Sequence, residues 1–319
     1  MSRRHILERL TPDFGFFYEA GRTLHTAKTR YQHLEIIESR EFGHVLLLDG
    51  VTQVTTRNEF LYHEPMVHPA LTCHPRSQDV LVIGGGDGGI LREVLRYNTV
   101  RKAVMAELDG GVVDFCAKHL PEISCGAFND PRADIRITDG RTFVEQTDER
   151  FDVVIMDMTD PFGPSVMLYT REFFQAVKRT FNDEDGIFVM HTESPISRQK
   201  TFQQCLGTLK SVFRYQRTFY LYVHMYATMW SVTVSSDKVD VSSLTADEIT
   251  ERLRLREVAG LQCYTGATHH SMLTAMPFIQ ELVDRVDDVP IITDHHPKVL
   301  DEIDLNRVTD LRLIDQTAP

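Results

Sequence analysis

Short apolar runs alternate with amphipathic segments along most of the chain after residue 78. Residues 80–83, Val-Leu-Val-Ile, are too few for a helix and rich in β-branched side chains, so they predict a buried strand. In residues 90–95 the apolar positions instead recur at helical spacing. This alternation predicts an α/β fold around an open parallel sheet, with an antiparallel pair at one edge. The further strands are expected at 103–106, 133–138, 151–156, 186–190, 217–222 and 227–234, and the further helices at 112–120, 141–146, 170–179 and 199–213.

The residues before this alternation predict a small β-rich domain. Residues 31–39 have strand character, and Asp49-Gly50 separates two further β-prone runs, 45–48 and 51–56. An Asp-Gly pair in this setting predicts a hairpin, because both turn positions need positive φ.

Residues 58–69 follow the hairpin and carry several polar side chains without an obvious partner. Asn58 is the expected N-cap of a helix there. The segment either covers a pocket or is a solvated connecting helix. We expect two domains, an N-terminal β-rich domain with this lid segment at 1–71, and a catalytic domain with a C-terminal extension at 72–319. The extension contains one amphipathic helix, 246–259, and an acidic surface after residue 284.

A glycine-rich turn, Gly84 to Gly89, joins the first strand of the alternation to its helix. Glu107 ends the second strand, 18 residues beyond Gly89. A carboxylate at this place in a βαβ unit is suited to a ribose, because it accepts from both hydroxyls. Asp87 lies within the turn, where it would repel a pyrophosphate. The pattern therefore predicts a site for adenosine with a neutral or cationic tail, although Asp87 could also simply cap the helix.

Acidic residues gather at the carboxyl ends of the expected strands, where open parallel sheets bind ligands. Asp139 and Asp157 follow two of these strands, and Asp160 comes three residues later. Together with Asp87 and Glu107 they would raise one another's pKa unless a positive charge entered. A polycation is one such occupant. A divalent metal is the rival, but the spacing follows no metal-binding loop, so we expect no metal.

Composition narrows the partners further. The chain has 319 residues and a net charge of −12, which favours cationic substrates and argues against nucleic acid. No apolar run approaches 18 residues and the first residues lack an apolar signal core, so we expect a cytoplasmic protein without a membrane partner. The five cysteines form no C-x-x-C pair and are expected to be reduced thiols.

An adenosine pocket beside several acids suits alkyl transfer from a sulfonium to an amine. The amine attacks the carbon next to sulfur, and the sulfonium leaves as a neutral thioether. An alkylammonium is protonated at neutral pH by roughly three pKa units, so freeing its lone pair costs about 4 kcal/mol unless a base takes the proton. Asp157 is our candidate for that base.

At these residues the chain resembles the polyamine aminopropyltransferases, the spermidine synthase family. The resemblance extends from about Tyr31 to Pro277 and rests on specific motifs: LLLDGVTQVTTRNEFLYHE, VLVIGGGDGGILREVL, ELD at 107–109, DG at 139–140 and DMTDPFGP at 157–164. It implies a small N-terminal β domain on a Rossmann-like methyltransferase-type core, assembled as dimers or tetramers. It also implies transfer of the aminopropyl group of decarboxylated S-adenosylmethionine, a co-substrate, to putrescine, giving spermidine and 5'-methylthioadenosine without a cofactor.

The resemblance also assigns roles to individual residues. It implies that Glu107 binds the ribose hydroxyls, Asp139 the adenine amino group and Asp87 the terminal ammonium of the donor. Asp157 matches the proton acceptor. The other implied donor-binding residues are Gln32, His63, Gly140 and Pro164, and the residues implied to orient the acceptor amine are Tyr62 and Asp160.

Departures from the family pattern fall mainly on the acceptor side. The usual acceptor-contacting tyrosine is replaced by Met225, with Tyr226 adjacent, and the usual glutamine after the strand at 187–190 is His191. We include Tyr226 and His191 among the acceptor-binding candidates. Two alternatives therefore stay open: an aminopropyltransferase with another acceptor, or a catalytically weak homologue that binds polyamines or nucleosides. A methyltransferase is disfavoured by Asp87 and by the acid pair at 157 and 160.

Overall fold

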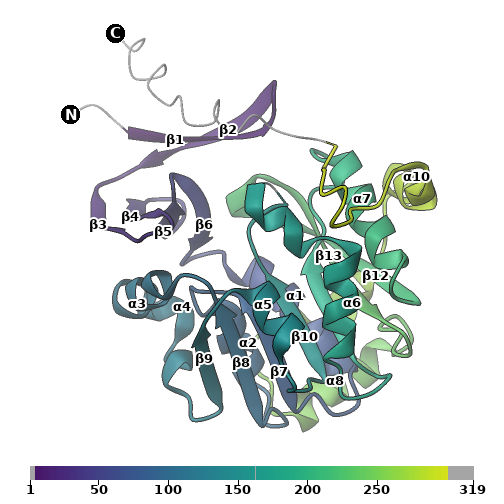
Figure 1. Ribbon diagram of the computed structural model, residues 1–319. Helices are drawn as coiled ribbons and strands as arrows, with labels where there is room; N and C mark the ends of the chain where they lie inside the picture. The colour runs from purple at the N-terminus through teal and green to yellow at the C-terminus, as the bar shows by residue number, and fades with distance from the viewer. Residues whose placement is uncertain (1–3, 162, 301–319) are drawn as a thin grey trace.

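The computed structural model describes residues 4–161 and 163–300. A small N-terminal β region lies above a larger α/β unit built around one sheet (Figure 1). This arrangement confirms the predicted α/β, Rossmann-like fold with its N-terminal β domain. The division at residue 71 stays a prediction.

The central sheet has seven strands in the order β12-β13-β11-β10-β7-β8-β9. The five strands from β11 to β9 are parallel, and β12 and β13 form the predicted antiparallel pair at the edge. Their bounds are β7 Asp79–Gly84, β8 Lys102–Glu107, β9 Ala133–Ile137, β10 Val153–Asp157, β11 Ile187–His191, β12 Tyr215–Val223 and β13 Thr228–Ser236.

Helices cover both faces of this sheet, which explains why its strands are continuously apolar. Val80 and Val82 pack on one face in a core that includes α1 and α2, whereas Leu81 and Ile83 pack on the other with α5, α6 and α7. The helices are α1 Phe60–Cys73, α2 Gly89–Leu95, α3 Gly110–His119, α4 Pro121–Ser124, α5 Gly140–Gln146, α6 Arg171–Arg179, α7 Gln199–Lys210, α8 Ala246–Leu255, α9 Gly266–Met272 and α10 Pro277–Asp284. The short 3₁₀ turns are η1 Ala127–Asn129, η2 Gly163–Leu168, η3 His224–Tyr226 and η4 Val286–Asp288.

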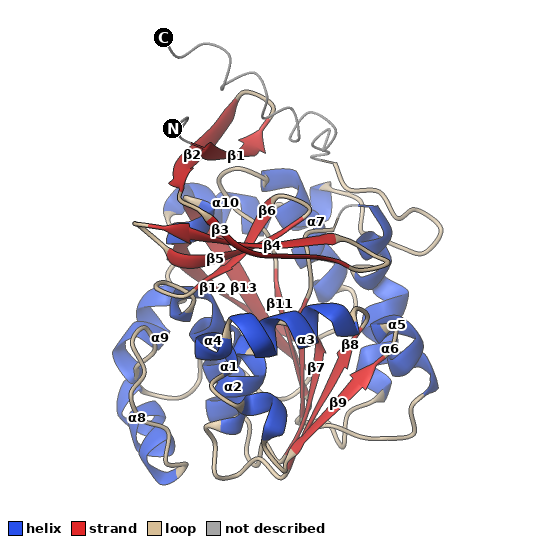
Figure 2. Cartoon of the chain, turned by 90° about the vertical axis from the view of Figure 1, so that its left-hand side faces the viewer, coloured by secondary structure: helices blue, strands red, loops and turns tan. Residues whose placement is uncertain are grey.

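The N-terminal region contains a four-stranded antiparallel sheet and a separate two-stranded hairpin. The predicted turn at Asp49 and Gly50 is confirmed, with φ of 50° and 84°. The sequence predicted a β-rich region here but not the individual strands β1 and β2. The four-stranded sheet lies across one end of the α/β unit, where it packs on α3 and α4 (Figure 2). The strands are β1 Arg4–Thr11, β2 Phe14–Ala20, β3 Thr23–Lys28, β4 His33–Ser39, β5 Gly43–Leu48 and β6 Val51–Thr55.

Helix α1 differs from the sequence expectation. It begins at Phe60 with Glu59 as N-cap, so Asn58 is not the cap, and Glu59 makes no side-chain capping bond. Every residue from Tyr62 to Cys73 is buried, which excludes a solvated connecting helix. The helix is buried because it lies against the sheet and α2 and binds the C-terminal region, where the Glu64 carboxylate accepts from the backbone N–H groups of residues 262–264.

The C-terminal extension packs against the α/β unit more closely than its polar sequence suggested. The helix expected at 246–259 ends at Leu255. Within the described part of the expected acidic surface, Ile292 and Val299 are buried in the core beneath α6 and α7, and Asp294 forms an ion pair with Arg141 at 2.6 Å. The rest of that surface, residues 301–319, lies outside the described residues.

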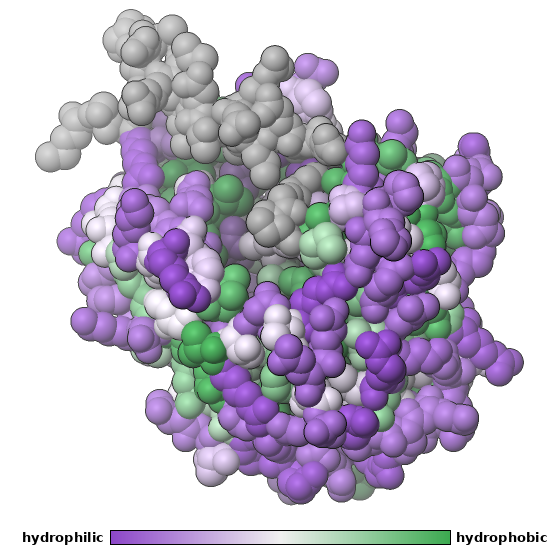
Figure 3. Space-filling model, in the orientation of Figure 1, coloured by the Kyte–Doolittle hydropathy of each residue, from purple (hydrophilic) through white to green (hydrophobic). Residues whose placement is uncertain are grey.

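Hydrophilic residues predominate on the face of the α/β unit seen in Figure 3, with apolar residues in smaller groups. Among the described residues, no helix is both long and apolar enough to cross a bilayer. The five cysteines are unpaired, and three of them are buried.

Candidate active site

The glycine-rich turn is held against the end of β10. Gly84 has a φ of +83°, and a Cβ atom there would lie 2.1 Å from the backbone oxygen of Asp157. The N–H of Gly85 donates to the same oxygen at 3.1 Å. Glycine is therefore required for both the left-handed conformation and the close approach of the two segments. This contact brings the turn and Asp157 together, as the sequence predicted.

Asp87 uses its two carboxylate oxygens differently. Oδ1 accepts from the backbone N–H of Gly89 at 2.7 Å, but the N-cap of α2 is Gly88, which has no side-chain capping bond. Oδ2 lies 3.8 Å from Nε2 of His63. The bond to Gly89 fixes the carboxylate within the turn and leaves Oδ2 beside a positive neighbour.

Glu107 lies at the end of β8 beside Gly86. Burial raises the pKa of its carboxyl to about 7, although the backbone N–H of Asp109 donates to Oε1 at 2.8 Å. Asp109 is a site residue that sequence reasoning missed. Its buried carboxylate caps α3 and accepts from Nε2 of Gln32 at 3.1 Å. This bond connects the loop before β4 to the end of β8, and the ELD motif was the signal available for it.

Asp139 and Gly140 follow β9 on the same side of the sheet. The N–H of Thr138 donates to the backbone oxygen of Glu107 at 2.8 Å, which places Asp139 just beyond the end of β8. Asp139 is exposed, and its Oδ1 caps α5 by accepting from the N–H of Thr142 at 2.7 Å. Gly140 is buried against Ile83 of β7. The side chain of the remaining donor-side candidate, Pro164, lies outside the described residues.

Asp157 ends β10 and remains partly accessible. Its Oδ1 accepts from the hydroxyl of Tyr62 at 2.9 Å. Burial and the negative charge of Asp87 raise the pKa of Asp157 to about 6, against the opposing effects of His63 and Tyr62. A carboxylate with a raised pKa is a stronger proton acceptor than a solvated one.

His63 is a buried imidazole among these acids. Burial alone would lower its pKa, but the hydrogen bond to Glu59 and the charges of Asp87, Glu59 and Asp157 together raise it to about 9. The bond from Nδ1 to Glu59 is 2.6 Å long, and Arg92 of α2 pairs with Glu59 at 2.7 Å. Glu59 thus holds a positive imidazolium next to Asp87. Sequence reasoning gave Glu59 no role in the site.

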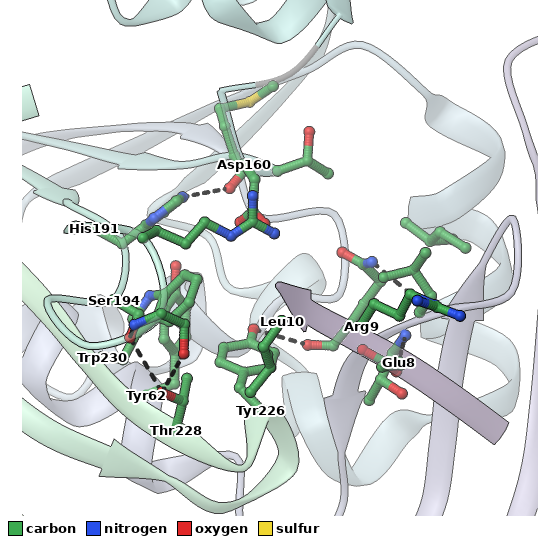
Figure 4. Close-up of a pocket in the computed structure, with 18 of the residues that line it drawn as sticks. Glu8, Arg9, Leu10, Tyr62, Asp160, His191, Ser194, Tyr226, Thr228 and Trp230 are labelled. Atoms are coloured by element: carbon green, nitrogen blue, oxygen red, sulfur yellow. Dashed lines mark hydrogen bonds between the residues drawn. The ribbon is translucent and has the colours of Figure 1, made fainter. Parts of the chain in front are cut away.

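A cavity of about 370 Å³ opens on the other side of Tyr62 (Figure 4). The predicted acceptor residues Tyr62, Asp160, His191 and Tyr226 all line it, and so does Gln32. Tyr226 comes from the turn between β12 and β13, whereas Met225 is fully buried in the core and lines no part of the cavity. At this turn Tyr226, and not Met225, therefore lines the cavity.

Strand β1 contributes Glu8, Arg9 and Leu10 to the cavity, which was not predicted (Figure 4). Burial raises the pKa of Glu8 to about 7, and the N–H of Thr52 donates to its carboxylate at 2.9 Å. The opposite wall carries hydroxyl, imidazole and indole groups. The wall residues are Thr159, His191, Ser194, Ser197, Arg198, Thr228 and Trp230.

One group of possible metal ligands lies at this wall. Ligand atoms of Asp160, His191 and Glu193 are within 4.8 Å of one another. Arg198 Nε lies 3.8 Å from Glu193 Oε2 and already supplies a positive charge there. The imidazole of His191 contacts the loop after β10 through Nε2. The positive charge of Arg198 opposes a cation beside Glu193.

The comparisons with known proteins agree with this geometry. Residues 59–245 match the spermine/spermidine synthase domain, and residues 5–56 match the spermidine synthase tetramerisation domain. A polyamine aminopropyltransferase of Nitrosomonas europaea is 40% identical over 284 residues, covering 89% of this chain and 87% of the relative. One from Caldicellulosiruptor saccharolyticus is 41% identical over 279 residues, covering 87% and 97%.

Solved structures are similar over the same extent. A spermidine synthase in complex with the transition-state analogue AdoDATO aligns with a TM-score of 0.80 and 33% identity, covering 88% of this chain and 94% of that one. The spermidine synthase from Thermotoga maritima aligns with a TM-score of 0.79 at the same identity. The chain belongs to the spermine/spermidine synthase family, whose curated relatives are polyamine aminopropyltransferases.

Proposed function

We propose that this protein transfers the aminopropyl group of decarboxylated S-adenosylmethionine to an amine, with putrescine as the first candidate acceptor. The products are spermidine and 5'-methylthioadenosine. The observation that carries the proposal is the position of Asp157, which lies against the glycine-rich turn and, through Tyr62, beside the acceptor cavity. A base placed between two such sites can act on an amine that enters from one and attacks a molecule held in the other.

The donor binds on the side of Asp157 where the glycine-rich turn lies. Glu107 accepts from the ribose hydroxyls and Asp139 from the adenine amino group, while Gly140, Gln32 and Pro164 complete the nucleoside site. Asp87 receives the terminal ammonium of the aminopropyl chain beside His63. Intact S-adenosylmethionine would instead bring a carboxylate toward Asp87, so charge repulsion selects the decarboxylated donor.

The acceptor enters the cavity, where Asp160, Tyr62, Tyr226 and His191 surround its amine. Asp157 takes a proton from the attacking ammonium. The nitrogen lone pair then forms a bond to the aminopropyl carbon next to sulfur as the carbon–sulfur bond breaks. The electron pair of that bond goes to sulfur, which leaves as the neutral thioether. Asp157 gives the proton an acceptor within the site, so that the amine need not lose it to bulk solvent before it attacks.

Assembly and cellular setting follow from the family at a coarser level. The tetramerisation-domain match at residues 5–56 supports an oligomer, and we propose a homodimer or homotetramer. We propose that transfer needs no cofactor, because the donor carries its own leaving group. A cytoplasmic location stays a prediction.

The test is an acceptor panel with the purified protein and decarboxylated S-adenosylmethionine. Putrescine, cadaverine, 1,3-diaminopropane, agmatine and spermidine are compared by mass detection of products. We expect the highest kcat/KM with putrescine. If another amine gives a higher kcat/KM, the proposed aminopropyl transfer stands but putrescine is not the preferred acceptor. Binding of methylthioadenosine without turnover of any amine would contradict the proposal and support the binding homologue.

A further inference from the structure

Two buried side chains contact the loop that joins Asp157 to Asp160. Nε2 of His191 lies 2.9 Å from the backbone oxygen of Met158. The hydroxyl of Tyr169 lies 2.9 Å from the backbone oxygen of Thr159. The two side chains also contact each other, with 2.8 Å between Tyr169 Oη and His191 Nε2. Tyr169 is fully buried and His191 is 2% exposed.

The partners determine where the hydrogens lie. A carbonyl oxygen only accepts, so the hydroxyl hydrogen of Tyr169 goes to Thr159 and the ring hydrogen of His191 is on Nε2. That hydrogen is shared between Met158 O and Tyr169 Oη. Burial lowers the pKa of His191, so Nδ1 stays unprotonated at neutral pH. Nδ1 has no hydrogen-bond partner among the described residues.

These contacts begin where the sheet ladder ends. The pairing of β10 with β11 stops at Met156 and Met190, one residue before His191. Beyond this point the backbone of residues 158–160 makes no ladder bonds to β11. The ring of Trp230 packs beside His191, with 5.6 Å between centroids, and restricts its rotation. The side chains of His191 and Tyr169 thus take over from the backbone ladder in holding the loop.

We propose that His191 and Tyr169 are a pair of positioning residues that fix the 157–160 loop. They hold the carbonyl groups of Met158 and Thr159, which lie between the proposed base and the second acid, so that both carboxylates face one amine. The proposal rests on the proposed function for the roles of Asp157 and Asp160. His191 acts on the loop through Nε2, whose hydrogen is used within the protein.

The pair accounts for a family departure. A glutamine at this position also carries a side-chain N–H that can reach a carbonyl, so a histidine with its hydrogen on Nε2 substitutes for it in this respect. A leucine cannot. A loss of loop position by about 1 Å is expected to reduce turnover about 100-fold.

The experiment compares His191→Leu, His191→Gln and Tyr169→Phe with the wild-type protein. We expect His191→Leu to lower kcat about 10- to 100-fold, with acceptor KM and methylthioadenosine affinity changed less than about 3-fold. His191→Gln should recover most of the lost kcat. In a double variant that carries His191→Leu and Tyr169→Phe, kcat should fall by less than the product of the two single-variant factors, because both side chains hold the same loop. Tyr264→Phe is the matched control, since it removes another buried tyrosine hydroxyl, bonded to His269, and should leave kcat unchanged.

Hydrogen exchange of the peptide covering residues 157–165 supplies a readout that needs no turnover. We expect faster exchange there in His191→Leu and Tyr169→Phe, with α7 unchanged. Unchanged exchange in both variants would overturn the positioning role of His191 and Tyr169, and so would faster exchange with an unchanged kcat. A wild-type protein that turns over no amine would overturn the proposed function, whereas hydrogen exchange would still show whether His191 and Tyr169 hold the loop. If His191→Leu does not fold, Tyr169→Phe carries the same comparison.

Discussion

Asp157, Glu107 and His63 share one carboxylate-rich site, but their surroundings suit them to different tasks. Burial raises the pKa of Asp157 to about 6 and that of Glu107 to about 7, whereas the acids around His63 raise its pKa to about 9. At neutral pH the free site therefore contains an imidazolium beside Asp87. This charge reduces the repulsion among the acids before a cationic donor arrives.

Asp157→Asn tests the base directly. The amide keeps the shape and can still contact Tyr62, but it accepts no proton at neutral pH. We expect turnover to fall about 10²- to 10⁴-fold, with donor affinity retained. Steady-state kinetics and methylthioadenosine titration measure the two quantities. Asp134→Asn, at a solvated ion pair with Arg136, serves as control. An unchanged turnover in Asp157→Asn would remove Asp157 from the role.

Asp87→Asn tests the selection of the donor. Without the negative charge, intact S-adenosylmethionine no longer brings two carboxylates together. We expect the ratio of affinities for the decarboxylated and intact donors to fall by about tenfold, roughly one unit charge interaction at a partly buried site. Competition against methylthioadenosine measures both affinities. A ratio equal to that of the wild type would contradict the charge argument.

The pH dependence follows from the raised pKa of Asp157. Only the ionised carboxylate accepts a proton, and the protonated form accumulates as the pH falls through about 6. We therefore expect kcat/KM to rise with pH across this range, since kcat/KM reports groups of the free enzyme. The limb near pH 6 should be absent from the residual kcat/KM of Asp157→Asn, whereas a limb near pH 7 from Glu107 should remain in both proteins. If Asp157→Asn keeps the lower limb, another group is responsible for it.

At the scale of elements, the site depends on the junction between β7, the glycine-rich turn and the end of β10. Gly84 and Gly50 have nearly equal φ values, +83° and +84°, but different surroundings. A Cβ atom at Gly50 would meet nothing within 4 Å, whereas one at Gly84 would collide with the backbone of Asp157. Substituting Gly50 and Gly84 in turn therefore distinguishes the cost of a left-handed conformation from the cost of steric overlap.

We expect Gly50→Ala to lower the free energy of unfolding by about 1 kcal/mol, the cost of a left-handed conformation for alanine. Gly84→Ala should cost at least about 2 kcal/mol more, because the backbone must move. It should also reduce turnover by displacing Asp157. Urea denaturation measures both variants. Equal losses would show that the turn can relax away from β10.

At the scale of the whole molecule, the N-terminal region belongs to both the site and the expected assembly. Its first strand supplies Glu8 to the cavity, while Phe14 and Phe17 of β2 are 60% and 66% exposed. Large exposed apolar side chains within a region that matches a tetramerisation domain indicate a surface for another copy of the chain.

We expect Phe17→Asp to lower the molecular mass measured by light scattering, because a charge there would be buried without a partner. Leu255→Asp is the control, since Leu255 is 60% exposed but lies outside the matched tetramerisation domain. The same mass for Phe17→Asp and the wild-type protein would exclude Phe17 from the interface. Circular dichroism checks that both variants are folded.

The sequence by itself determined the order of strands and helices in the α/β unit and the hairpin at Asp49-Gly50. It did so because strands buried on both faces are continuously apolar and because a two-residue turn needs special residues. It also indicated that Glu107 and Asp157 lie on one edge of the sheet, since the ends of parallel strands coincide there. These are consequences of local pattern and of one topological rule.

Only the tertiary structure decided which distant residues meet. It buried helix α1, brought Glu8 from the first strand into the cavity and placed Tyr226, rather than Met225, on the cavity wall. It also turned the N–H of His191 onto the loop after β10. No local pattern records such contacts, because burial and hydrogen-bond partners depend on segments far apart in the chain. The chemistry could be inferred from strand ends, but the shape of the acceptor site depended on packing.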